Sequence, residues 1–174
     1  MHQTPSSPRE NPRNLRTDLA NRLYFKLYQC ANMLHKTGTK AVEAQGLTTQ
    51  QWAVMGALSR PEAAQGMGMG DLARYLLMSR QNLAGLLTRM EATGYVHMVT
   101  DPSDKRARLV RLTEAGQQVW QHDAAVSIAG YYEQALEGFS THDMVHTLHY
   151  LIKLLDNMQA IDARQTGGED ADNS

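Results

Sequence analysis

Residues 71–112 read DLARYLLMSRQNLAGLLTRMEATGYVHMVTDPSDKRARLVRL, and the first half of this segment predicts two short helices. The first is expected at residues 71–77, with four residues turned inward: Leu72, Ala73, Leu76 and Leu77. Ser79 is placed to cap the second, residues 80–93, which Gly94 closes. Its buried side is expected to consist of Leu83, Leu86, Leu87 and Met90.

The second half of the segment predicts a β-hairpin. Strand-favouring residues occur at 95–99 and 108–112, on either side of the polar turn TDPSDKRA. Two short helices followed directly by a hairpin with a basic tip are typical of a winged helix-turn-helix. The expected fold class is therefore mainly α, with a small β wing.

Two helices are expected before this segment. Apolar residues recur at three- and four-residue steps from residue 15 to residue 44, which predicts a long amphipathic helix ended by Gly46. This stripe consists of Leu15, Leu19, Leu23, Leu27, Cys30 and Leu34. Thr48 and Gln51 have the spacing of a capping box, for a short helix that Pro61 stops. The glycine-rich residues 61–70 are expected to form a loop.

Two more helices are expected after the hairpin. Thr113 caps one that runs to about Leu136, and Gly138 terminates it. Ser140 and Asp143 cap the last helix. The last helix carries a continuous apolar stripe of Met144, Val145, Leu148, Leu151, Ile152, Leu155 and Met158.

These elements suggest one domain at residues 15–162, with a winged-helix lobe at 48–112. The helices at 15–45 and 113–160 have more apolar surface than so small a lobe can cover, so we expect them to pair with a second copy in a homodimer. Residues 1–14 are expected to be a disordered arm, and residues 163–174 a disordered acidic tail.

Composition and charge limit the function. The net charge of −1 hides an uneven distribution, because residues 112–174 hold two Lys/Arg against ten Asp/Glu, whereas residues 71–111 hold seven against four. A basic region joined to an acidic one indicates contact with a polyanion, although uneven solubilising charge would give the same pattern. Cys30 is the only cysteine, and no apolar run resembles a membrane span or a signal sequence. We therefore expect a cytoplasmic protein.

The predicted DNA contacts come from the outer side of the second lobe helix and from the hairpin tip. Gln81 can pair with adenine, and Arg80 can reach guanine or a phosphate. Gly85 either lets the backbone approach DNA closely or is simply tolerated. The hairpin can enter the minor groove, with Arg106 as the first choice; its charges could instead only prevent edge-to-edge pairing. The full set is Ser79, Arg80, Gln81, Asn82, Gly85, Thr88, Arg89, Asp104, Lys105, Arg106 and Arg108.

Three stretches resemble the multiple antibiotic resistance regulator (MarR) family: LTTQQWAVMGAL, DLARYLLMSRQNLAGLLTRMEATGYV and DPSDKRARLVRLTEAG. The resemblance implies a homodimer with two lobes on a pseudopalindromic site, and in most members repression of transcription. It also implies that Arg106 enters the minor groove while Asp104 orients it. The chain departs from the family at Gly85, where a polar residue is common, and at Met98–Val99, which replace a frequent basic pair.

The resemblance further implies an effector, an aromatic or phenolic carboxylate or its thioester, bound between the dimer helices and the lobe. The residues that could supply aromatic, sulfur or cationic contacts there are Arg16, Arg22, Tyr24, Tyr28, His35, Trp52, Met55 and Trp120. For each of these, ordinary core or surface packing is the alternative.

Other functions have less support in the sequence. Cys30 could sense oxidants, but its place on the apolar stripe predicts an inert buried thiol. His142, His146 and His149 share one side of the last helix and could bind zinc, or form a polar histidine face without metal. No glycine-rich phosphate loop, nucleophile elbow, HExxH or CxxC motif is present, so we expect neither an enzyme nor a cofactor. An interaction module without DNA binding is a third possibility.

Overall fold

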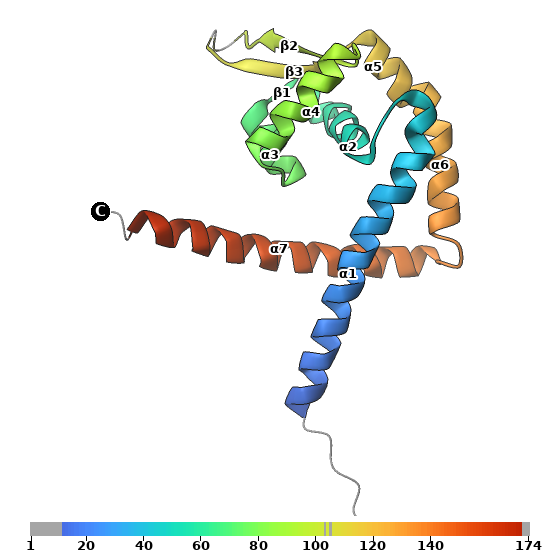
Figure 1. Cartoon of the computed structure of the whole chain (residues 1–174), viewed down its shortest axis with the longest axis vertical. Helices are drawn as coiled ribbons and strands as arrows, with labels where there is room; N and C mark the ends of the chain where they lie inside the picture. Colours follow the sequence, from blue (N-terminus) through green and yellow to red (C-terminus); the bar gives the residue numbers. More distant parts are fainter. Residues whose placement is uncertain (1–11, 103, 105, 172–174) are drawn as a thin grey trace, which may run out of the picture. The chain divides into compact units, whose positions relative to one another are not determined.

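The computed structural model describes residues 12–102, 104 and 106–171, and it shows a mainly helical chain with a small three-stranded sheet (Figure 1). The fold class predicted from the sequence is confirmed. The helices are α1 (Pro12–Val42), α2 (Thr49–Leu58), α3 (Met69–Leu76), α4 (Arg80–Ala92), α5 (Glu114–Gln118), α6 (Ala124–Ala135) and α7 (Thr141–Ala171). The strands are β1 (Met67–Gly68), β2 (Val96–Thr100) and β3 (Arg108–Leu112), and the short turns are η1 (Glu43–Gln45), η2 (Pro61–Ala63) and η3 (Val119–Asp123).

The chain divides into two compact units at Tyr131–Tyr132. None of the described helices combines the length and the apolar character that a membrane span requires. The predicted N-terminal arm lies outside the described residues up to residue 11, and Pro12 begins α1, as a proline readily does in a first helical turn.

The predicted breaks around α2 are confirmed. Gly46 ends η1 with a φ of 68°, a left-handed conformation that costs glycine little. Thr48 and Gln51 form a complete capping box: the Thr48 hydroxyl accepts from the Gln51 amide, and the Gln51 side chain accepts from the Thr48 amide. Thr49 then donates its hydroxyl to the carbonyl oxygen of His35 at 3.0 Å, which fixes the start of α2 against the end of α1.

One hydrophobic core holds the lobe together. It lies between α2, α3, α4 and the sheet, and the end of α1 and the start of α6 close it. The side of α4 that the sequence predicts to be buried is buried. The core consists of Val42, Leu47, Val54, Met55, Ala57, Leu58, Leu72, Ala73, Leu83, Leu86, Leu87, Met90, Val96, Val110, Leu112 and Ala124.

The expected loop at residues 61–70 is partly wrong. Pro61 starts η2, and Met67–Gly68 form β1, which pairs with the middle of β3 through Met67 and Val110. Gly66 turns the chain into this strand at a φ of 94°, where a Cβ would lie 2.6 Å from Cγ of Arg111. Gly66 therefore serves the close approach of the chain to β3, and the hairpin becomes a sheet with the order β1-β3-β2.

The expected burial of Leu77 is wrong. The turn between α3 and α4 requires a left-handed residue, and Leu77 adopts it with a φ of 54°. Its amide satisfies the last carbonyls of α3, while its side chain is 55% exposed. Met78 packs against the core from this turn instead.

The long helix expected from Thr113 is interrupted. Thr113 caps it as predicted, because its hydroxyl accepts from the Gly116 amide at 2.9 Å. After α5, however, Val119–Asp123 form a π-helical turn before α6 begins at Ala124, which is fully buried. A π-turn inserts an extra residue into the helix and changes which side chains face the core.

The cap predicted for the last helix is confirmed. The Ser140 hydroxyl donates to the Asp143 carboxylate at 2.6 Å, and the Ser140 amide donates to the same oxygen at 2.9 Å. These bonds hold the pKa of Asp143 below its ordinary value. The helix α7 continues to Ala171, past the end expected near residue 160, and residues 172–174 of the expected tail lie outside the described residues.

Candidate nucleic-acid interface and ligand sites

The helix α4 presents one polar side to solvent. Ser79 caps it by accepting from the Asn82 amide at 3.2 Å, so the first turn is ordered with its other donors pointing outward. All the α4 residues predicted to contact DNA are exposed: Ser79, Arg80, Gln81, Asn82, Gly85, Thr88 and Arg89. A helix with one buried stripe and an opposite polar side has the form that a major groove accepts.

Three positions on this side have specific local contacts. Thr88 donates its hydroxyl to the Ala84 carbonyl at 3.0 Å, so the hydroxyl oxygen is left to accept from a base or water. The guanidinium of Arg80 extends along α3, because a Cβ at Gly70 would lie 3.4 Å from its Nη2. At Gly85 a Cβ would meet only Arg89 Nη1, at 3.7 Å, so packing among the described residues does not require the glycine.

The wing tip is held by Asp104. Its carboxylate accepts from the backbone amide of Arg106 at 2.9 Å, and its carbonyl accepts from Ala107 at 2.9 Å. Arg106 and Arg108 are both exposed, and Arg108 also donates to the Met98 carbonyl at 3.2 Å. Lys105 lies outside the described residues. The aspartate thus fixes the backbone from which the predicted minor-groove arginine projects.

The structure separates the eight predicted ligand residues into two groups. Trp52 of α2 and Trp120 of η3 come together, with ring centroids 6.4 Å apart, and Met55, also of α2, is fully buried in the core. The α1 residues Arg16, Arg22, Tyr24, Tyr28 and His35 are all exposed. At about 1.5 Å per residue, Arg16 lies roughly 28 Å along α1 from His35.

A cavity that the sequence reasoning missed lies at the base of the wing. Its volume is about 450 Å³, and its walls come from the end of α2, the turn η2, the strands β2 and β3, and the segment α5–η3. Among the residues that line it are Arg60, His97, Arg111, Leu112, Gln117 and Trp120. We name it the wing-root cavity. The strand register could have indicated it, because His97 and Arg111 are direct partners across β2 and β3.

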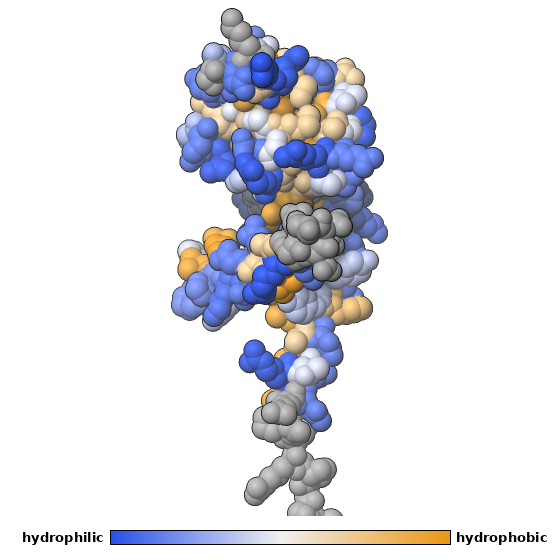
Figure 2. Space-filling model, turned by 90° about the vertical axis from the view of Figure 1, so that its left-hand side faces the viewer, coloured by the Kyte–Doolittle hydropathy of each residue, from blue (hydrophilic) through white to orange (hydrophobic). Residues whose placement is uncertain are grey.

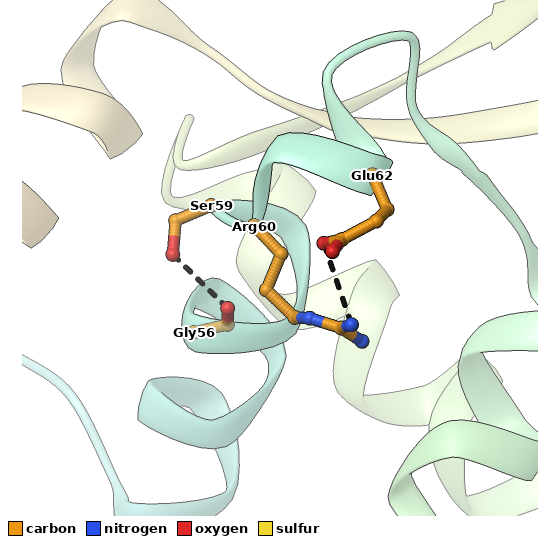
Figure 3. A network of polar contacts seen from close by, with 4 residues as sticks. All are labelled: Gly56, Ser59, Arg60 and Glu62. Carbon is orange, nitrogen blue, oxygen red and sulfur yellow. Dashed lines mark hydrogen bonds and ion pairs between the residues drawn. The ribbon is translucent and has the colours of Figure 1, made fainter.

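Arg60, which lines this cavity, already has partners within the chain. Figure 3 shows its ion pair with Glu62, at 3.3 Å, and the neighbouring bond from the Ser59 hydroxyl to the Gly56 carbonyl, at 3.0 Å. The guanidinium also lies 4.6 Å from the ring centroid of Tyr75. Arg111, by contrast, donates to the Ala64 carbonyl at 3.1 Å.

The structure also describes the two other candidate sensing sites, Cys30 and the histidines of α7. Cys30 is exposed, which corrects the expected burial: among the described residues, its stripe neighbours Leu23 and Leu34 are also exposed. The histidines of α7 form a ring cluster, with His142 and His146 centroids 4.2 Å apart and His149 5.2 Å from Tyr150. The described residues contain no group of three or more side chains placed to hold a metal ion.

Comparison with known proteins agrees with this architecture. A model of the MarR family matches residues 45–107. The chain is 59% identical over 158 residues to the transcriptional activatory protein BadR of Rhodopseudomonas palustris, covering 91% of this chain and 90% of that protein. It is 32% identical over 110 residues to the homoprotocatechuate degradative operon repressor of Escherichia coli, covering 63% of this chain and 72% of that protein.

The fold is also shared with solved structures. The crystal structure of AbfR of Staphylococcus epidermidis superposes with a TM-score of 0.73 at 24% identity, covering 86% of this chain and 99% of AbfR. The family match spans the helices α2, α3 and α4, the strand β2 and the wing tip up to residue 107, and all the predicted DNA contacts except Arg108 lie within it. This chain belongs to the MarR family of DNA-binding transcriptional regulators, which are not enzymes.

Proposed function

We propose that the protein binds a pseudopalindromic operator as a homodimer, and that an aromatic carboxylate or its thioester controls this binding. The observation that carries the proposal is the joint exposure of two surfaces. The polar side of α4 and the arginines of the wing are open on the lobe, while apolar stripes are open on the long helices. The first suits a duplex, and the second suits another copy of the chain.

The helix α4 and the wing contact different grooves of the DNA. Gln81, near the start of α4, is placed to read adenine in the major groove, and Arg80 and Arg89 flank it for guanine or phosphate contacts. Arg106 reaches the neighbouring minor groove from the wing, on a backbone that Asp104 holds.

A second copy would cover the long helices. Leu15, Leu19, Leu23 and Leu34 of α1 are each more than 40% exposed, as are Leu148, Leu151 and Ile152 of α7. Figure 2 shows hydrophobic patches among the hydrophilic side chains of the molecular surface. Twofold pairing would bury these residues and place two lobes on one duplex, which doubles the phosphate contacts.

Two relatives bear on the effector and the direction of control. Homoprotocatechuate, in the name of the Escherichia coli repressor, is a phenolic carboxylate, which supports the proposed effector class. The resemblance to the family implies repression, and the name of that relative supports it. The relative at 59% identity is named as an activator, and its match over nearly the whole chain supports activation as the direction here.

The test is a titration of the purified protein against its own upstream DNA, with fluorescence anisotropy as the readout. Binding at nanomolar to sub-micromolar concentrations that weakens steeply with salt is expected. Arg106→Ala should weaken it by about 1–3 kcal/mol, and Gln81→Ala should relax the preference at one base pair. The matched control is Arg164→Ala, an exposed arginine of α7. Absence of binding at low salt would refute the proposal.

The direction of control requires a separate measurement. Transcription from the bound promoter is compared in cells with and without the gene for this protein, each with and without added aromatic acid. A fall in transcription on deletion supports activation, and a rise supports repression.

A further inference from the structure

We propose that the wing-root cavity is the site at which the effector binds, with Arg111 and His97 holding its carboxylate and Trp120 contacting its ring. This inference rests on the proposed function, and it replaces the site expected between the dimer helices and the lobe, in a cleft beside α1. Only Trp120, of the eight residues predicted there, lines the cavity. The cavity of about 450 Å³ lies within the usual range for small-molecule sites, about 300–1,000 Å³.

The charge of the lining selects an anion. Arg60, His97 and Arg111 line the cavity, and among the described residues no Asp or Glu lines it. His97 and Arg111 are cross-strand partners, so their side chains leave the same side of the sheet at neighbouring positions. A carboxylate placed between them would accept from both.

Arg111 is the cation best prepared for this role. A guanidinium has five N–H donors, and the bond to the Ala64 carbonyl uses one of them. Among the described residues, no carboxylate forms an ion pair with Arg111, whereas Arg60 is paired with Glu62 and lies over Tyr75. The planar guanidinium suits two-point binding of a carboxylate.

The π-turn η3 supplies the aromatic wall. Its residues Trp120 and Gln121 both line the cavity, and π-turns occur frequently at functional sites. Gly56 of α2 makes room for the indole, since a Cβ there would lie 3.0 Å from Cη2 of Trp120. Pro61 adds an apolar contact, so an aromatic ring bearing a carboxylate matches both parts of the lining.

The location connects the site to DNA binding. The strand β3 carries Arg111 in the cavity and Arg108 at the other end, next to the wing tip. A ligand that draws Arg111 from the Ala64 carbonyl changes the contact between this strand and the segment before β1. By linkage, any factor by which the ligand changes DNA affinity is the factor by which DNA changes ligand affinity.

The first test measures binding of benzoate, 4-hydroxybenzoate and 4-hydroxycinnamate by calorimetry, each against its neutral amide. At least one acid should bind, and it should bind tenfold or more tightly than its amide. Arg111→Gln should remove this preference while DNA affinity without ligand stays within about threefold of wild type. In a Trp52→Phe background, the bound acid should change the fluorescence of Trp120.

A second variant tests the charge without altering the sheet. Gln117 lines the cavity and is exposed, so Gln117→Glu adds a negative charge there with little effect on folding. Its neighbour Gln118 is also exposed but is not part of the lining, so Gln118→Glu is the matched control. Gln117→Glu should weaken acid binding at least fivefold, and Gln118→Glu less than twofold.

Three results would overturn the proposal. The first is that no acid of the panel binds, and the second is that Gln117→Glu and Gln118→Glu bind the acid with equal affinity. The third is that Arg22→Gln loses acid binding while Arg111→Gln keeps it. The last would favour the cleft beside α1. Each leaves the DNA titration intact, so failure of this site is distinguishable from failure of the proposed function.

Discussion

The lobe and the long helices carry the same kind of apolar pattern but differ in what covers it. In α4, the residues at three- and four-residue steps are buried by the rest of the chain. In α1 and α7, residues in the same kind of pattern are exposed, Leu23 by 56% and Leu148 by 60%. Periodicity therefore identifies the side of a helix that must be covered, but not whether the same chain or another copy covers it.

The largest expected effect comes from placing charge on the uncovered stripe. Leu19→Asp combined with Leu23→Asp should convert the proposed dimer to monomers and reduce operator affinity by about 100-fold or more, because only one lobe then engages each duplex. Sedimentation velocity and the anisotropy titration measure the two effects.

The control for charge is Asn32→Asp, which lies on the opposite side of α1 by helical periodicity and is also exposed. It should leave the dimer intact. A wild-type protein that sediments as a monomer, or a double variant that remains dimeric, would show that the stripe is not the interface.

An intermediate effect is expected inside the lobe. A Cβ at Gly116 would overlap the carbonyl oxygen of Tyr95, so Gly116→Ala should lower the free energy of unfolding by about 1–3 kcal/mol. In α6, Gly130 has open space around its Cα, and Gly130→Ala should instead raise it by about 0.5–1 kcal/mol. Urea denaturation of both variants measures the difference, and a loss for Gly130→Ala equal to that for Gly116→Ala would refute the packing argument.

The smallest effect concerns the cap of α7. The Ser140 bonds lower the pKa of Asp143 in the folded chain. Their contribution to the free energy of unfolding is therefore complete above the unfolded pKa of about 3.9, and it is lost as the pH falls through the lower folded value. Ser140→Ala should raise the pKa of Asp143 toward its ordinary value, as followed by NMR titration of the carboxyl carbon. An unchanged titration curve would contradict the assigned cause.

Local chemistry made much of the lobe predictable. Short-range patterns predicted the caps at Thr48 and Ser79 and the buried side of α4, and the structure contains them. Outside the lobe, the same holds for the caps at Thr113 and Ser140. The strand β1 was not predictable in this way, because two residues become a strand only through pairing with β3. The exposure of Cys30 likewise depends on the course of the whole chain, whereas that of Leu77 follows from the left-handed turn after α3.

The candidate functional residues likewise include some that local patterns predict and some that depend on tertiary structure. The DNA-facing residues of α4 could be listed from helical spacing, and the described ones are exposed as that spacing implies. The wing-root cavity needed the register of two strands and an irregular helical turn, because His97, Arg111 and Trp120 are far apart in sequence. Sequence spacing along one helix, which suggested the α1 residues, could not reveal a site assembled from four segments.

The π-turn also sets how much change in length this part of the chain can tolerate. Each residue of a regular α-helix rotates the chain by about 100°. A π-turn accommodates one extra residue locally, so deletion of one residue within Val119–Asp123 can restore a regular helix while α6 keeps its orientation. Buried Ala124 would then stay in the core, and the hydroxyl of Tyr131 would keep its 3.0 Å contact with Thr37 of α1, whereas a deletion between Ala124 and Tyr131 would turn Tyr131 away. Natural variation in length should therefore be tolerated better within this turn than in the regular helix that follows it.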